Sequence, residues 1–366
     1  MMQMFITICL INALLLCKHA CGMLSLHTYN QLARSRGSYK SSAIGATLMR
    51  NPNPNVSSSS SSYTPSVPYK SGLQASDIRV PNKNIQDALK LASQDINALP
   101  WTNSITAKRT LSYMPMLQAQ LDIIKSLGME EVSVEEKFVY RTSDVKPAKI
   151  GNMNFKSDKF RSVRLTYFDA GDLVQEFNSL WYPAYEYDIP LLGIDLISLG
   201  KNRVLSVIDF QPLHPTAEYH SKYIEPLGDI RAKYQDLQGT LSGKFYDDTS
   251  FFSKNMLFGR FVDESKLSNV VLPAYNEYLK AYVELSSNAA PNHSAEATKV
   301  VLDRQTQYDI YSAVKDPAVG LFDTYFGKEW SASFVQDFLF KLSKGHTSTS
   351  LPVHNQQNPH PTGGHS

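Results

Sequence analysis

A series of short β-like segments separated by tight turns constrains this chain more than any other feature. Between Arg161 and Leu213, apolar runs alternate with turn signals such as Ala-Gly-Asp and Gly-Lys-Asn-Arg. Connections this short favour hairpins, and strands joined by hairpins are antiparallel because a parallel pair needs a long crossover. The stretch therefore predicts consecutive neighbouring strands of one antiparallel sheet.

The regions on both sides of this stretch complete the fold prediction. We expect about six β-strands, at residues 132–142, 150–160, 161–171, 173–183, 189–200 and 203–213. Apolar residues at helical spacing predict helices at residues 80–101, 114–130, 214–238, 270–288, 294–314 and 328–343. Helices before and after one antiparallel run predict an α/β fold, a three-layer α/β/α sandwich with a central, mainly antiparallel sheet.

Residues 1–75 and 344–366 are expected to lie outside this domain. Residues 1–17 form an apolar run without an acidic residue, which is typical of a signal peptide. Residues 23–50 are basic, rich in hydroxyl groups and free of Asp and Glu, which is typical of a transit peptide. Together they predict a bipartite presequence for a complex algal plastid; secretion with a disordered N-terminal arm is the alternative.

A Ser/Pro-rich spacer completes the predicted presequence region, and the tail at residues 344–366 is expected to be disordered because it is polar and rich in His, Pro and Gly. The intervening residues 76–343 are long enough for one domain with a substantial core. No membrane segment is expected in the mature form.

The composition of residues 76–343 excludes several kinds of site. All three cysteines precede residue 22, so the domain has no thiolate for a zinc site, an iron–sulfur cluster or nucleophilic catalysis. Only three histidines lie in the domain, and no HExxH, Walker A or GxGxxG motif occurs. The formal net charge of +2 is too small to indicate nucleic-acid binding. If the protein is an enzyme, carboxylates are its expected acid–base groups.

Asp195 is the most unusual residue of the central stretch, because it lies within the apolar run Leu-Leu-Gly-Ile-Asp-Leu-Ile. On a strand it shares one face with Leu191, Gly193 and Ile197. Gly193 is expected to leave space beside the acid for a flat ligand. Partial burial of a carboxyl disfavours its charged form and raises its pKa, which suits a proton donor. The alternatives are an acid that closes a turn and an acid that faces solvent.

Three further polar residues are weighed in the same way. Asn178 lies within a predicted strand, where Asn is uncommon. Such an Asn often hydrogen-bonds a ligand or the backbone; the alternative is an ordinary polar strand residue. Asp316 precedes a proline after a predicted helix, and Asp at such a place usually ends one element or caps the next. For Asp209, near the end of a predicted strand, we expect a structural role.

Several motifs in series resemble the ferredoxin-dependent bilin reductases. They are DAGDLVQEFNSLWYP, YDIPLLGIDLISLG, VIDFQPL, YDIYSAVKDPAVGLFDTYFGKEW and FLF, and their order and spacing match over residues 133–340. The resemblance implies an enzyme that reduces open-chain tetrapyrroles such as biliverdin. It also implies an α/β/α sandwich without bound cofactor, which works through substrate radicals. Electrons come singly from reduced [2Fe–2S] ferredoxin, and the protein supplies the protons.

The resemblance also assigns roles to residues. Asp195 matches the central-strand aspartate of the family, and Asp316 matches the acid on the opposite side of the pigment. In the branch that forms phycocyanobilin, a His stands in the place of Asn178 and a Glu in the place of Thr166, which argues against that activity here. The motifs look most like the branch that reduces biliverdin IXα at the C15–C16 methine bridge to 15,16-dihydrobiliverdin.

Two alternative functions stay open. One is a phycoerythrobilin-forming reductase, which acts on the A-ring of 15,16-dihydrobiliverdin or reduces biliverdin by four electrons. The other is a non-catalytic bilin carrier.

The same resemblance predicts where partners bind. Biliverdin is expected between the sheet and the C-terminal helices, with Lys244 and Arg260 toward its propionates. Lys156, Lys159 and Lys254 are the candidates for docking acidic ferredoxin. We expect a monomer; a second bilin reductase is a candidate further partner, and the sequence does not settle whether the product passes to it directly.

Overall fold

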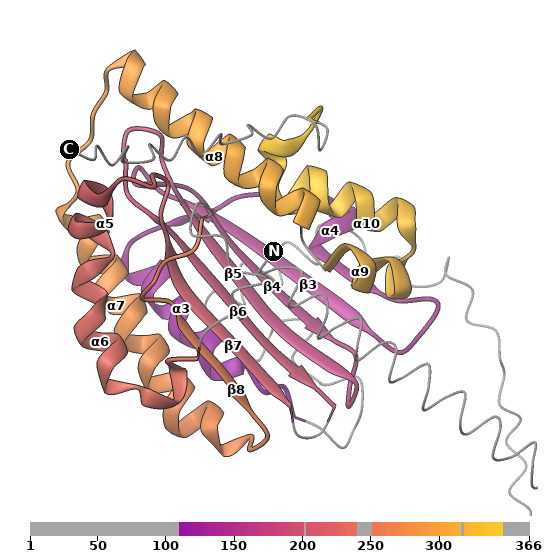
Figure 1. The fold of residues 1–366 in the computed structure, drawn as a ribbon. Helices are drawn as coiled ribbons and strands as arrows, with labels where there is room; N and C mark the ends of the chain where they lie inside the picture. Colours follow the sequence, from indigo (N-terminus) through magenta and orange to yellow (C-terminus); the bar gives the residue numbers. More distant parts are fainter. Residues whose placement is uncertain (1–109, 201–202, 240–250, 316–317, 347–366) are drawn as a thin grey trace, which may run out of the picture. The chain divides into compact units, whose positions relative to one another are not determined.

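The computed structural model describes residues 110–200, 203–239, 251–315 and 318–346. These residues form an eight-stranded sheet whose strands follow the order β1-β3-β4-β5-β6-β7-β8, with β2 paired to β3 (Figure 1). Every pair of named strands is antiparallel. The strands are β1 (Glu130–Glu131), β2 (Tyr140–Thr142), β3 (Lys149–Lys156), β4 (Phe160–Asp169), β5 (Val174–Pro183), β6 (Leu191–Leu199), β7 (Val204–Gln211) and β8 (Leu257–Phe261).

Helices cover both faces of the sheet, so the predicted three-layer α/β/α sandwich is confirmed (Figure 1). One face packs against α3 (Met114–Ser126) and α7 (Leu272–Asn288), which continues from the π-helical turn η4 (Leu267–Val271). The short elements α5 (Ala217–Tyr223), η2 (Glu225–Leu227), α6 (Gly228–Lys233) and η3 (Gln235–Leu237) follow β7. The other face carries α4 (Glu136–Val139), α8 (Ala295–Lys315), α9 (Ala318–Phe326), α10 (Lys328–Phe334), η5 (Val335–Leu339) and η6 (Lys341–Ser343).

The larger core lies between the sheet and α3 with α7. Trp181 is fully buried there, with its ring edge-on to Phe160 at 5.2 Å and to Tyr282 of α7 at 6.0 Å between ring centroids. Its indole Nε1 donates a hydrogen bond to Oε1 of Gln120 on α3, at 2.8 Å. Because alternate residues of a strand point to opposite faces, β5 sends Phe177 and Trp181 into this core and the residues between them to the other face.

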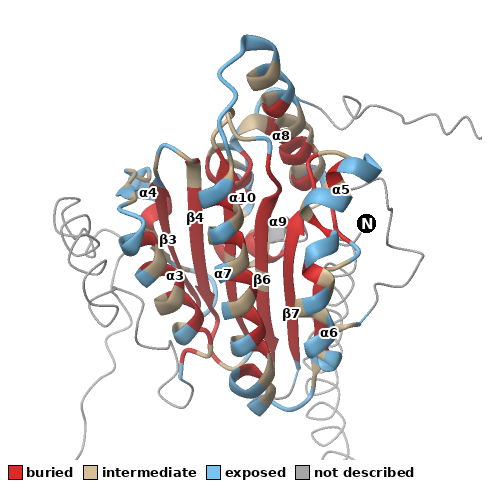
Figure 2. Ribbon diagram, turned by 90° about the vertical axis from the view of Figure 1, so that its left-hand side faces the viewer, coloured by how far each residue is buried: buried red, intermediate tan, exposed pale blue. Residues whose placement is uncertain are grey.

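On the opposite face, α9 and α10 pack through stacked aromatic rings. Phe168 of β4 lies edge-on to Phe322 and Tyr325 of α9, and Trp330 of α10 stacks on Phe334 at 4.6 Å between ring centroids. Figure 2 shows β3, β4, β6 and β7 as mostly buried, with helices alongside. These ring contacts pack α9 against the sheet and hold α10 together with it.

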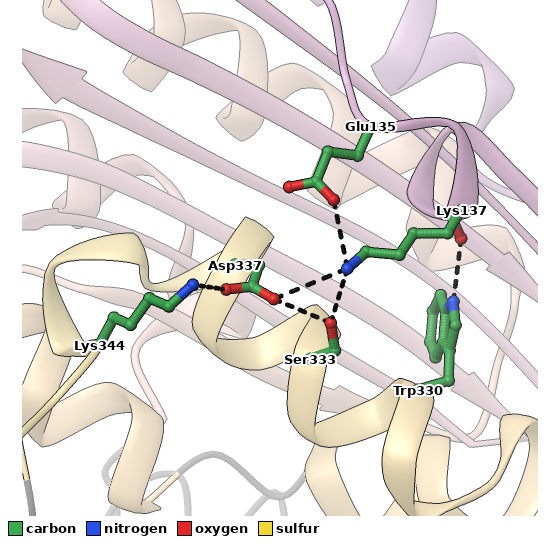
Figure 3. A network of polar contacts seen from close by, with 6 residues as sticks. All are labelled: Glu135, Lys137, Trp330, Ser333, Asp337 and Lys344. Atoms are coloured by element: carbon green, nitrogen blue, oxygen red, sulfur yellow. Dashed lines mark hydrogen bonds and ion pairs between the residues drawn. The ribbon is translucent and has the colours of Figure 1, made fainter.

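A network of polar contacts joins the C-terminal layer to α4 (Figure 3). Lys137 lies 3.2 Å from Glu135 and 3.7 Å from Asp337, and donates a hydrogen bond to Ser333 at 3.0 Å. Trp330 Nε1 donates to the backbone carbonyl of Lys137 at 2.9 Å, and Lys344 lies 2.7 Å from the other oxygen of Asp337. Most of these charges are exposed, so each ion pair contributes at most about 1 kcal/mol. The network therefore adds little to stability.

Three details differ from the sequence prediction. The strand expected at residues 132–142 is the short helix α4 followed by β2. The helix expected at residues 214–238 is divided into four short helices, because Pro226 has no backbone N–H to continue α5 and the backbone at Tyr234 is not helical. Strand β8 was not predicted at all.

Other predictions are confirmed or lie outside the described residues. Helix α3 ends where Gly128 adopts a positive φ of 62°, as the sequence predicts. The helix expected at residues 80–101, the presequence and the tail beyond residue 346 lie outside the described residues. Among the helices that are described, none is long and apolar enough to cross a membrane.

Candidate active site

A row of polar side chains crosses the sheet on the face that α8, α9 and α10 cover. Asn152 pairs with Thr166, Thr166 with Asn178, and Asn178 with Asp195, on the consecutive strands β3 to β6. Residues directly opposite in an antiparallel sheet share one face, with Cβ atoms about 4.5–5.5 Å apart. Three residues singled out from the sequence, Thr166, Asn178 and Asp195, are therefore immediate neighbours.

The helical cover is open over the middle of this row. In β5 every residue except Asn178 is buried, and in β6 every residue except Asp195 is buried. These two side chains are direct register partners. An opening limited to one paired Asn and Asp, in two otherwise buried strands, is where a ligand on this face can reach the sheet.

Arg164 on β4 hydrogen-bonds two residues of the polar row, and the sequence prediction missed it. It lies on the same face of β4 as Thr166 and is only 4% exposed. Its Nη1 donates hydrogen bonds to Asn178 Oδ1 at 2.9 Å and to Thr166 Oγ1 at 3.3 Å. Thr166 donates in turn to Asn152 Oδ1 at 2.7 Å, and Asn152 donates to the carbonyl of Phe138 at 2.5 Å. The only sequence signal for Arg164 was its place two residues before Thr166 on a predicted strand.

A second acid lies buried beside the row, on α8. Asp309 is 1% exposed and accepts hydrogen bonds from the hydroxyl of Tyr182 at 2.7 Å and from the backbone N–H of Leu342 at 2.9 Å. Burial raises the pKa of Asp309 to about 6, although Arg161, the Tyr182 hydrogen bond and Arg164 act in the opposite direction. Asp309 therefore holds its proton to a higher pH than an ordinary Asp, and its charge interacts with Arg164, which holds Asn178.

The raised pKa of Asp309 makes stability depend on pH in a defined direction. An unfolded Asp titrates near 4, so the folded protein holds the extra proton between about pH 4 and pH 6. The free energy of unfolding should therefore fall as the pH rises through this window, by about 3 kcal/mol from this group. Urea unfolding at several pH values should show a flatter profile for Asp309→Asn. An unchanged profile would contradict the assignment.

The space expected beside Gly193 is filled. The side chain of Gln211 lies so close that a Cβ at Gly193 would meet its amide at 2.6 Å. Gln211 is held by the hydroxyl of Tyr308 on α8, which donates to its Oε1 at 2.7 Å. The expectation of open space was wrong, because the glycine accommodates a neighbouring side chain of β7. Asn178 and Asp195, in contrast, keep part of their surface exposed on this face.

Asp209 has the structural role expected from its position. It is fully buried, and its carboxylate accepts hydrogen bonds from both the backbone N–H and the hydroxyl of Ser253. Burial raises the pKa of Asp209 well above its ordinary value, and the two hydrogen bonds oppose that shift. The acid fastens the segment before β8 to β7.

The remaining sequence-predicted residues are placed as follows. Arg260 lies exposed on β8, in register with Leu205, and its guanidinium lies 5.3 Å from the ring centroid of Phe258. Phe258 is two positions from Arg260 and pairs with Val207, the register partner of Asp195, so Arg260 is on the same face as Asp195. Asp316 and Lys244 lie outside the described residues.

The three lysines expected to dock ferredoxin all have local partners. Lys156 lies 3.5 Å from Glu130, and Lys254 lies 3.1 Å from Glu225. Lys159 donates to the backbone carbonyls of Ser286 and Ser287 at the end of α7. Among the described residues, no group of three or more His, Cys, Asp or Glu side chains could hold a metal ion.

Comparison with known proteins gives a consistent result. Residues 117–341 match the model of the ferredoxin-dependent bilin reductase family. The chain is 39% identical over 232 residues to the 15,16-dihydrobiliverdin:ferredoxin oxidoreductases of Nostoc punctiforme and of Gloeobacter violaceus, covering 63% of this chain and 95% of each relative. The fold is similar to that of tomato phytochromobilin synthase in complex with biliverdin, with a TM-score of 0.58, 21% identity, and coverage of 64% of this chain and 84% of that chain.

Proposed function

This chain belongs to the ferredoxin-dependent bilin reductases, and we propose that it reduces biliverdin IXα at the C15–C16 methine bridge to 15,16-dihydrobiliverdin. The observation that carries the proposal is the opening over Asn178 and Asp195, where a half-buried acid faces the ligand side of a covered sheet. The relatives from Nostoc punctiforme and Gloeobacter violaceus, which this chain matches over 95% of their length, are named 15,16-dihydrobiliverdin:ferredoxin oxidoreductase.

The reaction adds two electrons and two protons to the pigment. Reduced ferredoxin supplies the electrons one at a time, so a bilin radical forms between the two transfers. Asp195 lies where it can deliver a proton to a pigment over the sheet, because it is the one acidic residue of β6 and is not buried. Asp316 is the proposed second proton donor from the other side of the pigment.

The groups around Asp195 support binding of a pigment that is flat and has anionic arms. Arg260 is exposed on the same face, at the open edge strand β8, where it can meet a propionate without desolvating a buried charge. Biliverdin is thus proposed to lie with its pyrrole rings over Asn178 and Asp195 and its propionates toward Arg260 and Lys244. No bound cofactor is needed in this scheme.

We also propose a plastid location for the mature domain, supported by the acid-free N-terminal segments of the sequence. The domain is proposed to act as a monomer that passes its product to a second bilin reductase. A second reductase is a fitting partner because the product is itself an open-chain tetrapyrrole.

The product distinguishes this function from its alternatives. Anaerobic incubation of the full chain with biliverdin and a ferredoxin-reducing system should yield 15,16-dihydrobiliverdin as the chromatographic product. The same mixture started from 15,16-dihydrobiliverdin should leave that pigment unchanged. Formation of phycoerythrobilin from either substrate would assign the chain to the A-ring-reducing branch, and binding without bleaching would assign it to the carriers.

A further inference from the structure

Arg164 is a cation buried on the sheet face. It is 4% exposed and forms no ion pair with any residue that the structure describes. The ring of Phe340 lies 6.0 Å from its guanidinium, and its Nε is buried without a hydrogen-bond partner in the described part of the chain. Burying a cation away from direct contact with a carboxylate is costly, and the nearby Asp309, whose pKa Arg164 helps to lower, offsets part of this cost.

The hydrogen bonds of Arg164 fix the direction of one side-chain amide. A guanidinium can only donate, so the atom of Asn178 that faces it at 2.9 Å has to be the oxygen. Thr166 cannot replace this donor, because its single hydroxyl proton is given to Asn152. Turning the Asn178 amide over would set its NH₂ group against the donors of Arg164. The amide therefore has one stable orientation.

The other end of the same amide is directed away from β4. The Asn178 oxygen is bound from the β4 side, while its register partner on the other side is Asp195 of β6. The Nδ2 of Asn178 makes no hydrogen bond to a described residue, and the side chain is only half-buried. Two N–H donors are thus held at the opening over the sheet.

We propose that Arg164 is a positioning residue that holds Asn178 with its NH₂ group toward Asp195 and the bilin. The position then recognises a hydrogen-bond acceptor, either the Asp195 carboxylate or a carbonyl oxygen of the pigment, and disfavours a pyrrole N–H. This inference rests on the proposed function and adds a determinant of how the pigment is oriented. It concerns Asn178 and Asp195, the half-buried residues of β5 and β6.

A double-mutant cycle tests the proposal in the full chain. Arg164→Gln and Asn178→Ala should each lower kcat/KM for biliverdin by about tenfold to a hundredfold, the effect of losing a hydrogen bond to a charged group. Because Arg164 acts through Asn178, the double variant should be no worse than Asn178→Ala alone. The absorption spectrum of bound biliverdin, measured without ferredoxin, should change in the same way in all three variants.

Arg161→Gln is the matched control. Arg161 lies on the same strand and beside the same buried Asp309, but it hydrogen-bonds Gln305 at 2.6 Å and stacks 4.1 Å from the Tyr182 ring centroid instead of touching Asn178. Its effect should add to that of Asn178→Ala. If Arg164→Gln keeps the wild-type spectrum and kcat/KM, or if its effect also adds to that of Asn178→Ala, the positioning role is wrong.

Two further variants identify the acceptor and guard against misfolding. Asn178→Asp gives Arg164 an anionic partner and should unfold at higher urea concentration, yet it should lose activity because an acceptor replaces the donor. A weaker affinity for biliverdin in this variant assigns the acceptor to the pigment, whereas a displaced pH profile of turnover assigns it to Asp195. Arg164→Lys, which keeps a donor and a positive charge, should restore part of the loss seen in Arg164→Gln.

The readouts separate this inference from the proposed function. If wild-type protein forms no reduced bilin, the proposed reaction is wrong. The spectra of bound biliverdin still test the positioning role of Arg164. If it binds no bilin either, the cycle is measured on urea unfolding alone. There, coupling between Arg164 and Asn178 supports the fixed amide, and additive effects overturn it.

Discussion

Replacing Asp195 by asparagine is expected to lower the rate of biliverdin reduction by about 10²–10⁴-fold, the usual effect of removing a general acid. Asparagine keeps the shape and the hydrogen-bonding size of the side chain but cannot release a proton at neutral pH. Because Asp195 lies at the open position of β6, the change should leave the fold and the affinity for pigment nearly intact. Single-turnover spectroscopy with excess reduced ferredoxin should show electron entry followed by an accumulating radical intermediate.

Asp209→Asn is the control for this experiment. Asp209 is an acid on the adjacent strand and the same face, in register with Gly193, but it is fully buried and bound to Ser253. Its replacement should lower the free energy of unfolding and leave the rate for folded protein within a few-fold of wild type. Full turnover of Asp195→Asn with an unchanged product would show that the proton comes from elsewhere.

The parts of the site that could be predicted from the sequence follow from local rules. Short connections make neighbouring strands antiparallel, so the order β4-β5-β6-β7 could be predicted from the sequence. The two-residue period of a strand places Asp195 on the face opposite Ile194 and Leu196, whichever way the sheet packs. An acid within such an apolar run therefore marks a candidate site through its local pattern alone.

The parts that could not be predicted depend on contacts between distant segments. Strand β8 is five residues long and pairs with β7 across a long connection, so no local pattern separates it from its helical surroundings. Arg164 looks like a solvent-facing charge on a predicted strand, and only the helical cover with Phe340 shows that it is buried. The filling of the space at Gly193 by Gln211 likewise depends on side-chain packing across β6 and β7.

The same dependence on distant contacts makes Trp181 the residue whose loss should cost the fold most. Its fully buried indole contacts Phe160 and Tyr282 and hydrogen-bonds Gln120, so it joins the sheet to both α3 and α7. Trp181→Ala should lower the free energy of unfolding by about 3–5 kcal/mol, because it leaves a large cavity in a close-packed core. Urea unfolding and thermal melting should both show this, with Tm lower by roughly 10 °C.

Trp181→Phe separates the cavity from the hydrogen bond. Phenylalanine keeps most of the aromatic volume but removes the indole N–H from Gln120, which still accepts from the hydroxyl of Ser179 at 2.8 Å. This variant should therefore lose about 1–2 kcal/mol, well below the loss for alanine. Trp181 pairs with Leu192 on β6, three residues from Asp195, so loosening of this pair should also reach the site. A Trp181→Ala protein as stable as wild type would mean that this core does not hold the strand that presents Asp195.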